Sequence, residues 1–343
     1  MNKTDKKAKK TVAEQVEVLL GQKKKTPLPN DILVDALDGY ASAQLSSGAL
    51  TIKLKKIEER IRSEVKDSDI AVHYIKSLSM GKESRAIGVY SVRPVSMGHA
   101  TYFGAYFHSL VFKPDCCLFL SAVEPAGTTS HLHERIISRS QHPYSTFTEA
   151  QGRLSDFWPL FAEAGNRLRL AGKSASPIQY FASSWADGLL FGEMQYLPVE
   201  EGLGAPYVVE FKDGVGRQEL LPDLYSQGDK RLLASFKTFI GPAELKPAQI
   251  EIRNKLDKFR EKHADVVEKM KWRWRIGNPA RHPISLEIAR VLGCRDMDFG
   301  KLEEASAEMI DLVTSDIWLS EAEKNRENAE RAKERAQNDP EPA

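Results

Sequence analysis

The chain has 343 residues, of which 41% are hydrophobic, so it can bury the core of one large domain or of two ordinary ones. A formal charge of +1 gives no whole-protein field that would indicate an acidic or a basic partner. Three cysteines, two of them adjacent, exclude a disulfide framework, the longest apolar run (100–112) is too short to span a bilayer, and the first residues contain no apolar segment of a secretory signal. We therefore expect a cytoplasmic protein that makes no membrane contact.

The first part of the chain combines a basic segment with helical and strand patterns. Residues 1–27 carry eight lysines against three acidic residues, a local charge of +5, which predicts a flexible basic tail over residues 1–28. Apolar residues recur at helical spacing in residues 50–66. Three runs rich in aromatic and β-branched residues then predict strands, at 86–95, 100–112 and 116–124.

Helical patterns return at Ser130, which is the predicted N-cap of a helix that ends before Pro143. Residues 146–149 read as a capping box for a second helix, and a helical stretch over 156–163 is expected to stop near Gly165. Four strand-like runs follow and predict a meander: 177–185, 188–197, 205–212 and 231–240.

The expected fold class is α+β, with helices packed on an antiparallel β-meander and a helical C-terminal region. The core domain is assigned to residues 29–245. A basic and then mixed helical region follows at 246–318, and a charged helix and tail at 319–343.

The segment SHLHERIISRSQH (130–142) concentrates histidine and arginine on one helix. A helical projection places His131, Arg135 and Ser138 on one face, whereas the isoleucines and leucine fall on the other. His133 falls among the apolar residues and is expected in the core. Arg139 follows Arg135 by one turn. The polar face of this helix is therefore the predicted functional surface.

These residue types suit RNA cleavage without a metal. The positive end of the helix dipole favours a neutral imidazole at His131, as a general base requires. Arg135 can hold a phosphate through two parallel hydrogen bonds and stabilise the charge that develops on it. His131 would then take the proton of the 2′-OH. The alternative interpretation is a basic helix face exposed to solvent.

The pattern HLHERIISR (131–139), followed by a helix and a β-meander, resembles the barnase/EndoU/colicin/RelE-like superfamily of toxin nucleases. The resemblance covers residues 128–242 and implies that His131 is the base and Arg135, with Arg139, the phosphate ligand. Such folds commonly take further active-site residues from the last strand, which implies Lys237 and Thr238 here. Leu132 departs from the pattern, because a small residue usually follows the histidine.

A second hypothesis is a Mg²⁺-dependent nuclease of the PD-(D/E)xK kind. Glu210 and Lys212 form Glu-x-Lys on an expected strand, with Asp187 upstream; two carboxylates would hold the metal and the lysine would assist the attacking water. The alternative interpretation of residues 207–220 is a simple β-hairpin around a glycine-rich turn.

A third hypothesis is a subunit that binds nucleic acid or a partner without catalysis. Residues 269–282 interleave tryptophan with basic residues, a composition that suits phosphate contacts and base stacking on a single strand. The residues concerned are Lys269, Lys271, Trp272, Arg273, Trp274, Arg275 and Arg281. A helix that buries its tryptophans and solvates its charges fits the same composition.

The first hypothesis predicts a hydrolase of toxin or antiviral-defence type, a nuclease that acts on RNA rather than DNA and needs no cofactor. An antitoxin or another partner protein is a candidate partner.

Overall fold

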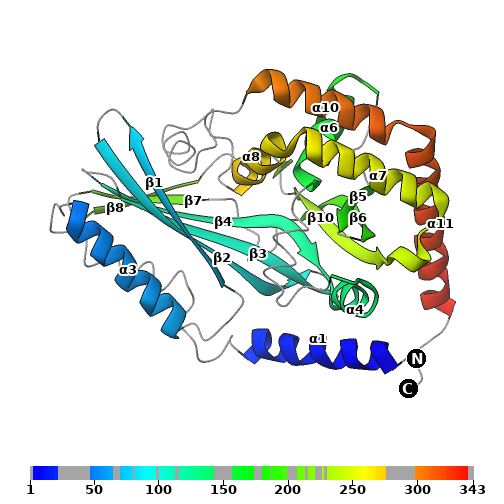
Figure 1. Ribbon diagram of the computed structural model, residues 1–343, viewed down its shortest axis with the longest axis horizontal. Helices are drawn as coiled ribbons and strands as arrows, with labels where there is room; N and C mark the ends of the chain where they lie inside the picture. The colour runs from blue at the N-terminus through cyan, green and yellow to red at the C-terminus, as the bar shows by residue number, and fades with distance from the viewer. Residues whose placement is uncertain are drawn as a thin grey trace.

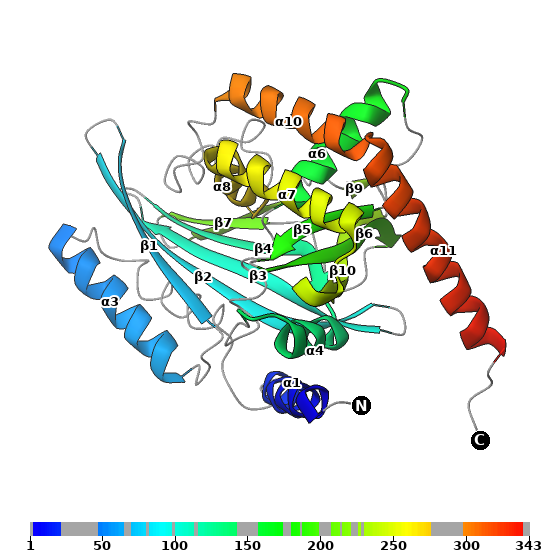
Figure 2. The ribbon, with the colours of Figure 1, turned by 45° about the vertical axis from the view of Figure 1, so that its right-hand side comes forward.

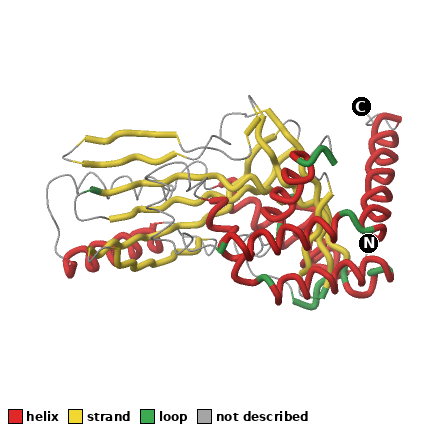
Figure 3. The backbone as a smooth tube through the Cα atoms, turned by 90° about the horizontal axis from the view of Figure 1, so that it is seen from above, coloured by secondary structure: helices red, strands yellow, loops and turns green. Residues whose placement is uncertain are grey.

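The computed structural model describes the following residues: 3–21, 47–64, 70–79, 82–97, 100–112, 116–142, 157–173, 180–185, 187–198, 207–212, 215–220, 226–227, 230–275 and 298–338. The ten described strands form one sheet, and the helices gather mainly around one end of it (Figures 1 and 3). The α+β fold class predicted from the sequence is confirmed, as is the helical C-terminal region. In the described part of the chain, no helix is both long and apolar enough to cross a bilayer.

The first half of the sheet is an antiparallel meander of four long strands in chain order. Their bounds are β1 Ile70–Ser79, β2 Lys82–Met97, β3 Ala100–Phe112 and β4 Cys117–Thr128. The three runs predicted as strands lie in β2, β3 and β4, and the bounds of β3 agree with those predicted. Aromatic and β-branched side chains suit such a pleated, half-buried surface.

The second half of the sheet is not the sequential meander that the sequence predicted. Its strands are β5 Tyr180–Trp185, β6 Gly188–Pro198, β7 Tyr207–Lys212, β8 Val215–Leu220, β9 Ser226–Gln227 and β10 Lys230–Ile240. β10 lies between β4 and β6, parallel to the first and antiparallel to the second. β7 forms a hairpin with β8 and pairs with the first half of β4. β7 and β10 thus share one edge of β4, end to end.

The helices follow the amphipathic patterns of the sequence in most places. Their bounds are α1 Lys3–Gly21, α3 Ser47–Glu64, α4 Ser130–Arg139, α6 Trp158–Leu170, α7 Pro247–Lys262, α8 Ala264–Arg275, α10 Phe299–Val313 and α11 Asp316–Asn338, with a 3-10 turn at Pro242–Glu244. α6, α7, α8 and α10 gather above the sheet, and α1 and α4 lie below it (Figure 2).

Lys3–Gly21 of the predicted flexible tail form a helix, and the rest of the predicted tail lies outside the described residues. α1 lies against α4, with Ala8 and Val12 each 1% exposed. These two residues are four positions apart and so share one helix face. That narrow apolar stripe is enough to dock α1, while Lys6, Lys7 and Lys10 stay exposed.

α6 continues through Gly165, where the sequence predicted its end, and stops at Gly172. Gly172 has φ of 68°, which a residue with a Cβ rarely adopts. Its N–H donates to the carbonyl of Arg169 (3.0 Å), and that of Lys173 donates to Leu168 (2.9 Å). These two bonds form a Schellman motif, which satisfies the last carbonyls of the helix. The capping box at residues 146–149 lies outside the described residues.

Aromatic rings connect the C-terminal helices to the second half of the sheet. Phe161 of α6 packs against Phe181 of β5 and stacks on Trp318 of α11, with centroids 6.0 and 5.3 Å apart. Phe181 in turn meets Phe236 of β10 edge-on at 4.8 Å. Buried aromatic pairs of this kind contribute roughly 0.5–1.5 kcal/mol each beyond their burial. They fix α11 relative to β10, and both elements line the site described next.

Candidate functional site

The helix with the predicted functional face follows β4 without a loop. Thr128 ends the strand, and the side chain of Thr129 accepts a hydrogen bond from the N–H of Leu132 (3.2 Å). Thr129 is therefore the N-cap, where the sequence predicted Ser130, and the helix begins one residue earlier. Both residue types are good caps, so sequence alone does not separate them. The buried face of α4 carries Leu132 and Ile136.

His133 is fully buried, as the helical projection predicted. Its Nε2 lies 2.8 Å from the Thr128 hydroxyl, and that hydroxyl donates to the carbonyl of Phe103 (3.4 Å). If the hydroxyl donates to Phe103, it accepts from an Nε2–H group of the imidazole. Burial lowers the pKa of His133 to about 3. This histidine is a structural part of the core rather than a reacting group.

His131 and Arg135 lie in contact on the exposed face of α4. The Nε of Arg135 donates to the Nε2 of His131 over 3.3 Å. Because a guanidinium can only donate, Nε2 is the acceptor and carries the lone pair, and the proton of the neutral ring is on Nδ1. A phosphate that bound Arg135 would therefore meet the basic nitrogen of His131 next to it.

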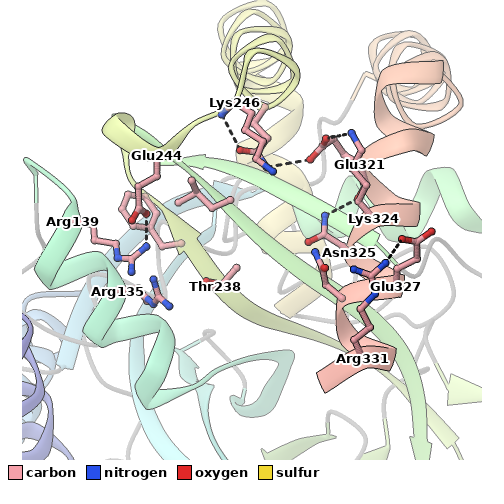
Figure 4. A pocket seen from close by; sticks show the side chains of 14 residues that line it. Arg135, Arg139, Thr238, Glu244, Lys246, Glu321, Lys324, Asn325, Glu327 and Arg331 are labelled. Carbon is pink, nitrogen blue, oxygen red and sulfur yellow. Dashed lines mark hydrogen bonds and ion pairs between the residues drawn. The ribbon is translucent and has the colours of Figure 1, made fainter. Parts of the chain in front are cut away.

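Arg135 and Arg139 extend from α4 into an open groove of about 590 Å³ (Figure 4). Four parts of the chain form its walls: α4, the end of β10, the start of α7 and the exposed half of α11. The other described residues that line it are Thr238, Phe239, Ile240, Glu244, Lys246, Gln249, Glu321, Lys324, Asn325, Glu327, Asn328 and Arg331. The structure thus brings two residues of the predicted helix face together with Thr238.

Ion pairs neutralise part of the charge in the groove. Arg139 pairs with Glu244. On α11, Lys324 pairs with Glu321 at 2.9 Å and Arg331 with Glu327 at 3.3 Å, and Gln249 also donates to Glu321 (3.1 Å).

Of the five described basic residues that line the groove, two have no carboxylate partner among the described residues. No described carboxylate lies within ion-pair distance of Arg135 or Lys246. The described lining therefore carries a net charge of +2, which favours an anionic ligand.

A β-bulge places Lys237 and Thr238 beside each other. Phe236 pairs with Gly192 and Thr238 with Phe191, so Lys237 is the extra residue of β10. Lys237 pairs with Glu193 at 3.9 Å, and Glu193 shares a face of β6 with Phe191. The bulge thus turns both side chains toward the same face, and such irregularities are frequent next to active sites. Lys237 is not among the groove-lining residues, and its ammonium lies 5.8 Å from the ring of Tyr102.

The far wall of the groove was not predicted from the sequence. Lys246 precedes α7, and Asn325, Asn328 and Arg331 lie on α11 almost two hundred residues after Arg135. The sequence shows α11 as a charged helix, and nothing in that pattern indicates which face meets β10. The weak signal is the spacing of Trp318, Ala322 and Asn325, which marks the side of α11 turned toward the protein.

The structure does not bring the proposed metal-binding carboxylates together. Glu210 faces Leu118 near the start of β4, whereas Asp187 precedes Leu189, which pairs with Ile240 beyond the end of β4. Leu118 and Thr128 are ten residues apart along β4, roughly 33 Å at 3.3 Å per residue. This length of strand is only part of the separation between Glu210 and Asp187. In the described parts of the chain, no three His, Cys, Asp or Glu side chains are placed to hold a metal ion. The structure describes the backbone of Lys212 but not its side chain.

The basic tryptophan segment is described in part. Lys269 is half-buried on α8 and pairs with Asp265 at 3.1 Å. Of the residues that follow, α8 holds the backbone of Lys271, Trp272, Arg273, Trp274 and Arg275, whose side chains are not described, and Arg281 lies outside the described residues.

Comparison with known proteins identifies no relative: no family model, no curated protein and no solved structure matches this chain.

Proposed function

We propose that this protein is a metal-independent ribonuclease whose active site lies on α4, with Arg135 in the groove and His131 in contact with it, outside the residues that line the groove. One observation carries the proposal: the arginines of α4 and Thr238 of β10, far apart in sequence, line one open groove with a net positive charge. The contact between His131 and Arg135 adds a base next to a phosphate ligand.

In the proposed reaction, Arg135 binds the scissile phosphate and leaves the Nε2 of His131 free to accept a proton. His131 takes the proton of the 2′-OH, the 2′ oxygen attacks phosphorus, and the bond from phosphorus to the 5′ oxygen breaks. Arg135 stabilises the negative charge that develops on the phosphorane. The leaving 5′ oxygen takes a proton from solvent, to which the groove is open. The products are a 2′,3′-cyclic phosphate and a free 5′-OH.

Arg139, Thr238 and Lys237 have auxiliary roles in this proposal. Arg139 is held by Glu244 and lies one turn from Arg135, so it orients the strand rather than binding the reacting phosphate. Thr238 offers a hydroxyl from the floor of the groove, and Lys237 adds charge beside it. A role in the cytoplasm as a toxin or in phage defence, with an antitoxin or other partner protein, belongs to the same proposal and rests on the resemblance of residues 128–242.

The test is cleavage of end-labelled single-stranded RNA and DNA in EDTA and, separately, in Mg²⁺. RNA cleavage in EDTA that produces a cyclic phosphate and disappears in His131→Ala is the expected result. His142→Ala is the matched control, because His142 is also exposed and lies three residues beyond the end of α4. Equal cleavage by His131→Ala and the unmodified protein would overturn the assignment of the base, and cleavage that requires Mg²⁺ would overturn the mechanism.

A further inference from the structure

The two groove cations that have no carboxylate partner in the described part of the chain come from different walls. Arg135 lies on α4, and Lys246 is the residue that precedes α7. Each is exposed or half-buried, so each can reach a ligand from solvent. Two charges on two elements can each contact a different anionic group where another group lies between them.

A neutral ion pair separates these two charges. Arg139 is one helical turn beyond Arg135, and its partner Glu244 is two residues before Lys246. The order across this side of the groove is therefore Arg135, the Arg139–Glu244 pair, and Lys246 (Figure 4). The carboxylate between the two cations repels a third anion and keeps the two anionic positions distinct.

We propose that the groove holds two phosphodiester groups of one RNA strand, the scissile phosphate at Arg135 and a neighbouring phosphate at Lys246. The proposal rests on the ribonuclease function for the first position only. An ammonium binds phosphate as a point charge without fixed geometry, so the Lys246 position recognises the backbone and not a base. The substrate class is then single-stranded RNA of at least three nucleotides.

The experiment measures binding of two 2′-O-methyl oligonucleotides, which cannot be cleaved because the attacking hydroxyl is blocked. One is a dinucleotide with a single phosphodiester. The other adds a second phosphodiester and an abasic sugar, so the added group contains no base. The unmodified protein is expected to bind the longer molecule about tenfold more tightly, the size of one charge-assisted hydrogen bond.

Lys246→Gln is expected to remove most of that tenfold gain, and Lys246→Arg to keep it. Lys255→Gln is the matched control. It removes the same charge from the exposed surface of α7, outside the groove, where Lys255 pairs with Glu251 at 2.9 Å. An undiminished gain in Lys246→Gln overturns the second phosphate position.

The outcomes separate this inference from the proposed function. Suppose that the longer oligonucleotide binds more tightly in a way that depends on Lys246, but the protein cleaves no RNA. That result supports the two phosphate positions and overturns the ribonuclease function. Cleavage that depends on His131, with no gain that depends on Lys246, does the reverse. Binding of neither oligonucleotide, together with no cleavage of RNA, overturns both.

Discussion

The carboxylate of Asp187, just before β6, accepts hydrogen bonds from the two residues that follow α4. The hydroxyl of Ser140 donates to one oxygen (2.9 Å) and the N–H of Gln141 to the other (2.6 Å). Arg253 of α7 donates to the carbonyl of Asp187 (2.9 Å), which holds Asp187 itself in place. The C-terminal end of the candidate catalytic helix is thus tied to the sheet by a residue 47 positions away. This contact, rather than metal binding, is the role that the structure gives Asp187.

Asp187→Ala is expected to lower the free energy of unfolding by about 2 kcal/mol, because a hydroxyl and an N–H lose a charged acceptor. Urea denaturation measures this loss. Asp187→Asn keeps one acceptor oxygen and is expected to lose roughly half as much. An alanine variant as stable as the unmodified protein would show that the two hydrogen bonds do not hold α4.

His133 makes stability depend on pH in the acid range. Its pKa is about 3 in the folded protein and 6.5 in its ordinary state, so between these values the unfolded chain binds a proton that the folded chain does not. The free energy of unfolding therefore falls as pH falls through 6.5, by at most roughly 1.4 kcal/mol per pH unit from this group. Urea denaturation of His133→Leu between about pH 4.5 and 7.5 is expected to show a smaller slope.

The matched control for that series is His131→Gln, which removes an exposed histidine from the same helix. A slope that changes as much in His131→Gln as in His133→Leu would contradict the assignment of the acid sensitivity to the buried ring. If His133→Leu and the unmodified protein have the same slope, the acid sensitivity comes from other groups.

Gly188 is required by close packing at the start of β6. A Cβ there would lie 2.3 Å from Cε2 of Phe239 and 2.5 Å from the carbonyl oxygen of Ile240, which belongs to the backbone and cannot move aside. Gly188→Ala is expected to cost roughly 1–3 kcal/mol or more of stability, as overpacked sites do. Gly48→Ala in α3 is the control. No neighbour lies within 4 Å of its Cβ, so it is expected to stabilise by a few tenths to about 1 kcal/mol. Thermal unfolding of both variants tests the contrast.

Glu244→Gln is expected to release Arg139 and so to strengthen RNA binding in the groove. One more free cation should make the slope of log affinity against log salt steeper by about 0.7 for a single strand. Fluorescence anisotropy with a 2′-O-methyl oligonucleotide at several salt concentrations measures this slope. Glu251→Gln removes an exposed carboxylate outside the groove and is expected to leave it unchanged. A slope that stays constant in Glu244→Gln would mean that Arg139 does not meet phosphate.

Local patterns predicted the elements and one wall of the groove. The strand at residues 100–112, the helix at 50–66 and the burial of His133 all follow from side-chain period and residue type, which neighbouring residues determine. The predicted end of α6 at Gly165 is wrong, because the sequence offers both Gly165 and Gly172 as possible ends of the helix. The left-handed backbone that ends the helix at Gly172 is visible only in the structure.

These local patterns do not predict which strands pair when the strands are far apart in the sequence. The return of β10 between β4 and β6 depends on which hydrogen-bonding edges remain free after the first four strands have paired. The bulge at Lys237 and the approach of α11 to β10 depend on that pairing in turn. Hence Arg135 and Thr238 could be named from the sequence, whereas Lys246 and the α11 residues could not.

Arg135 of α4 and Arg331 of α11 line the same groove, although Arg331 is synthesised nearly two hundred residues after Arg135. A ribosome that has made the sheet and α4 has not yet made the wall that carries Arg331. The complete groove therefore appears only after residue 331 has left the exit tunnel. During its own translation, the nascent chain carries the polar face of α4 without an assembled site.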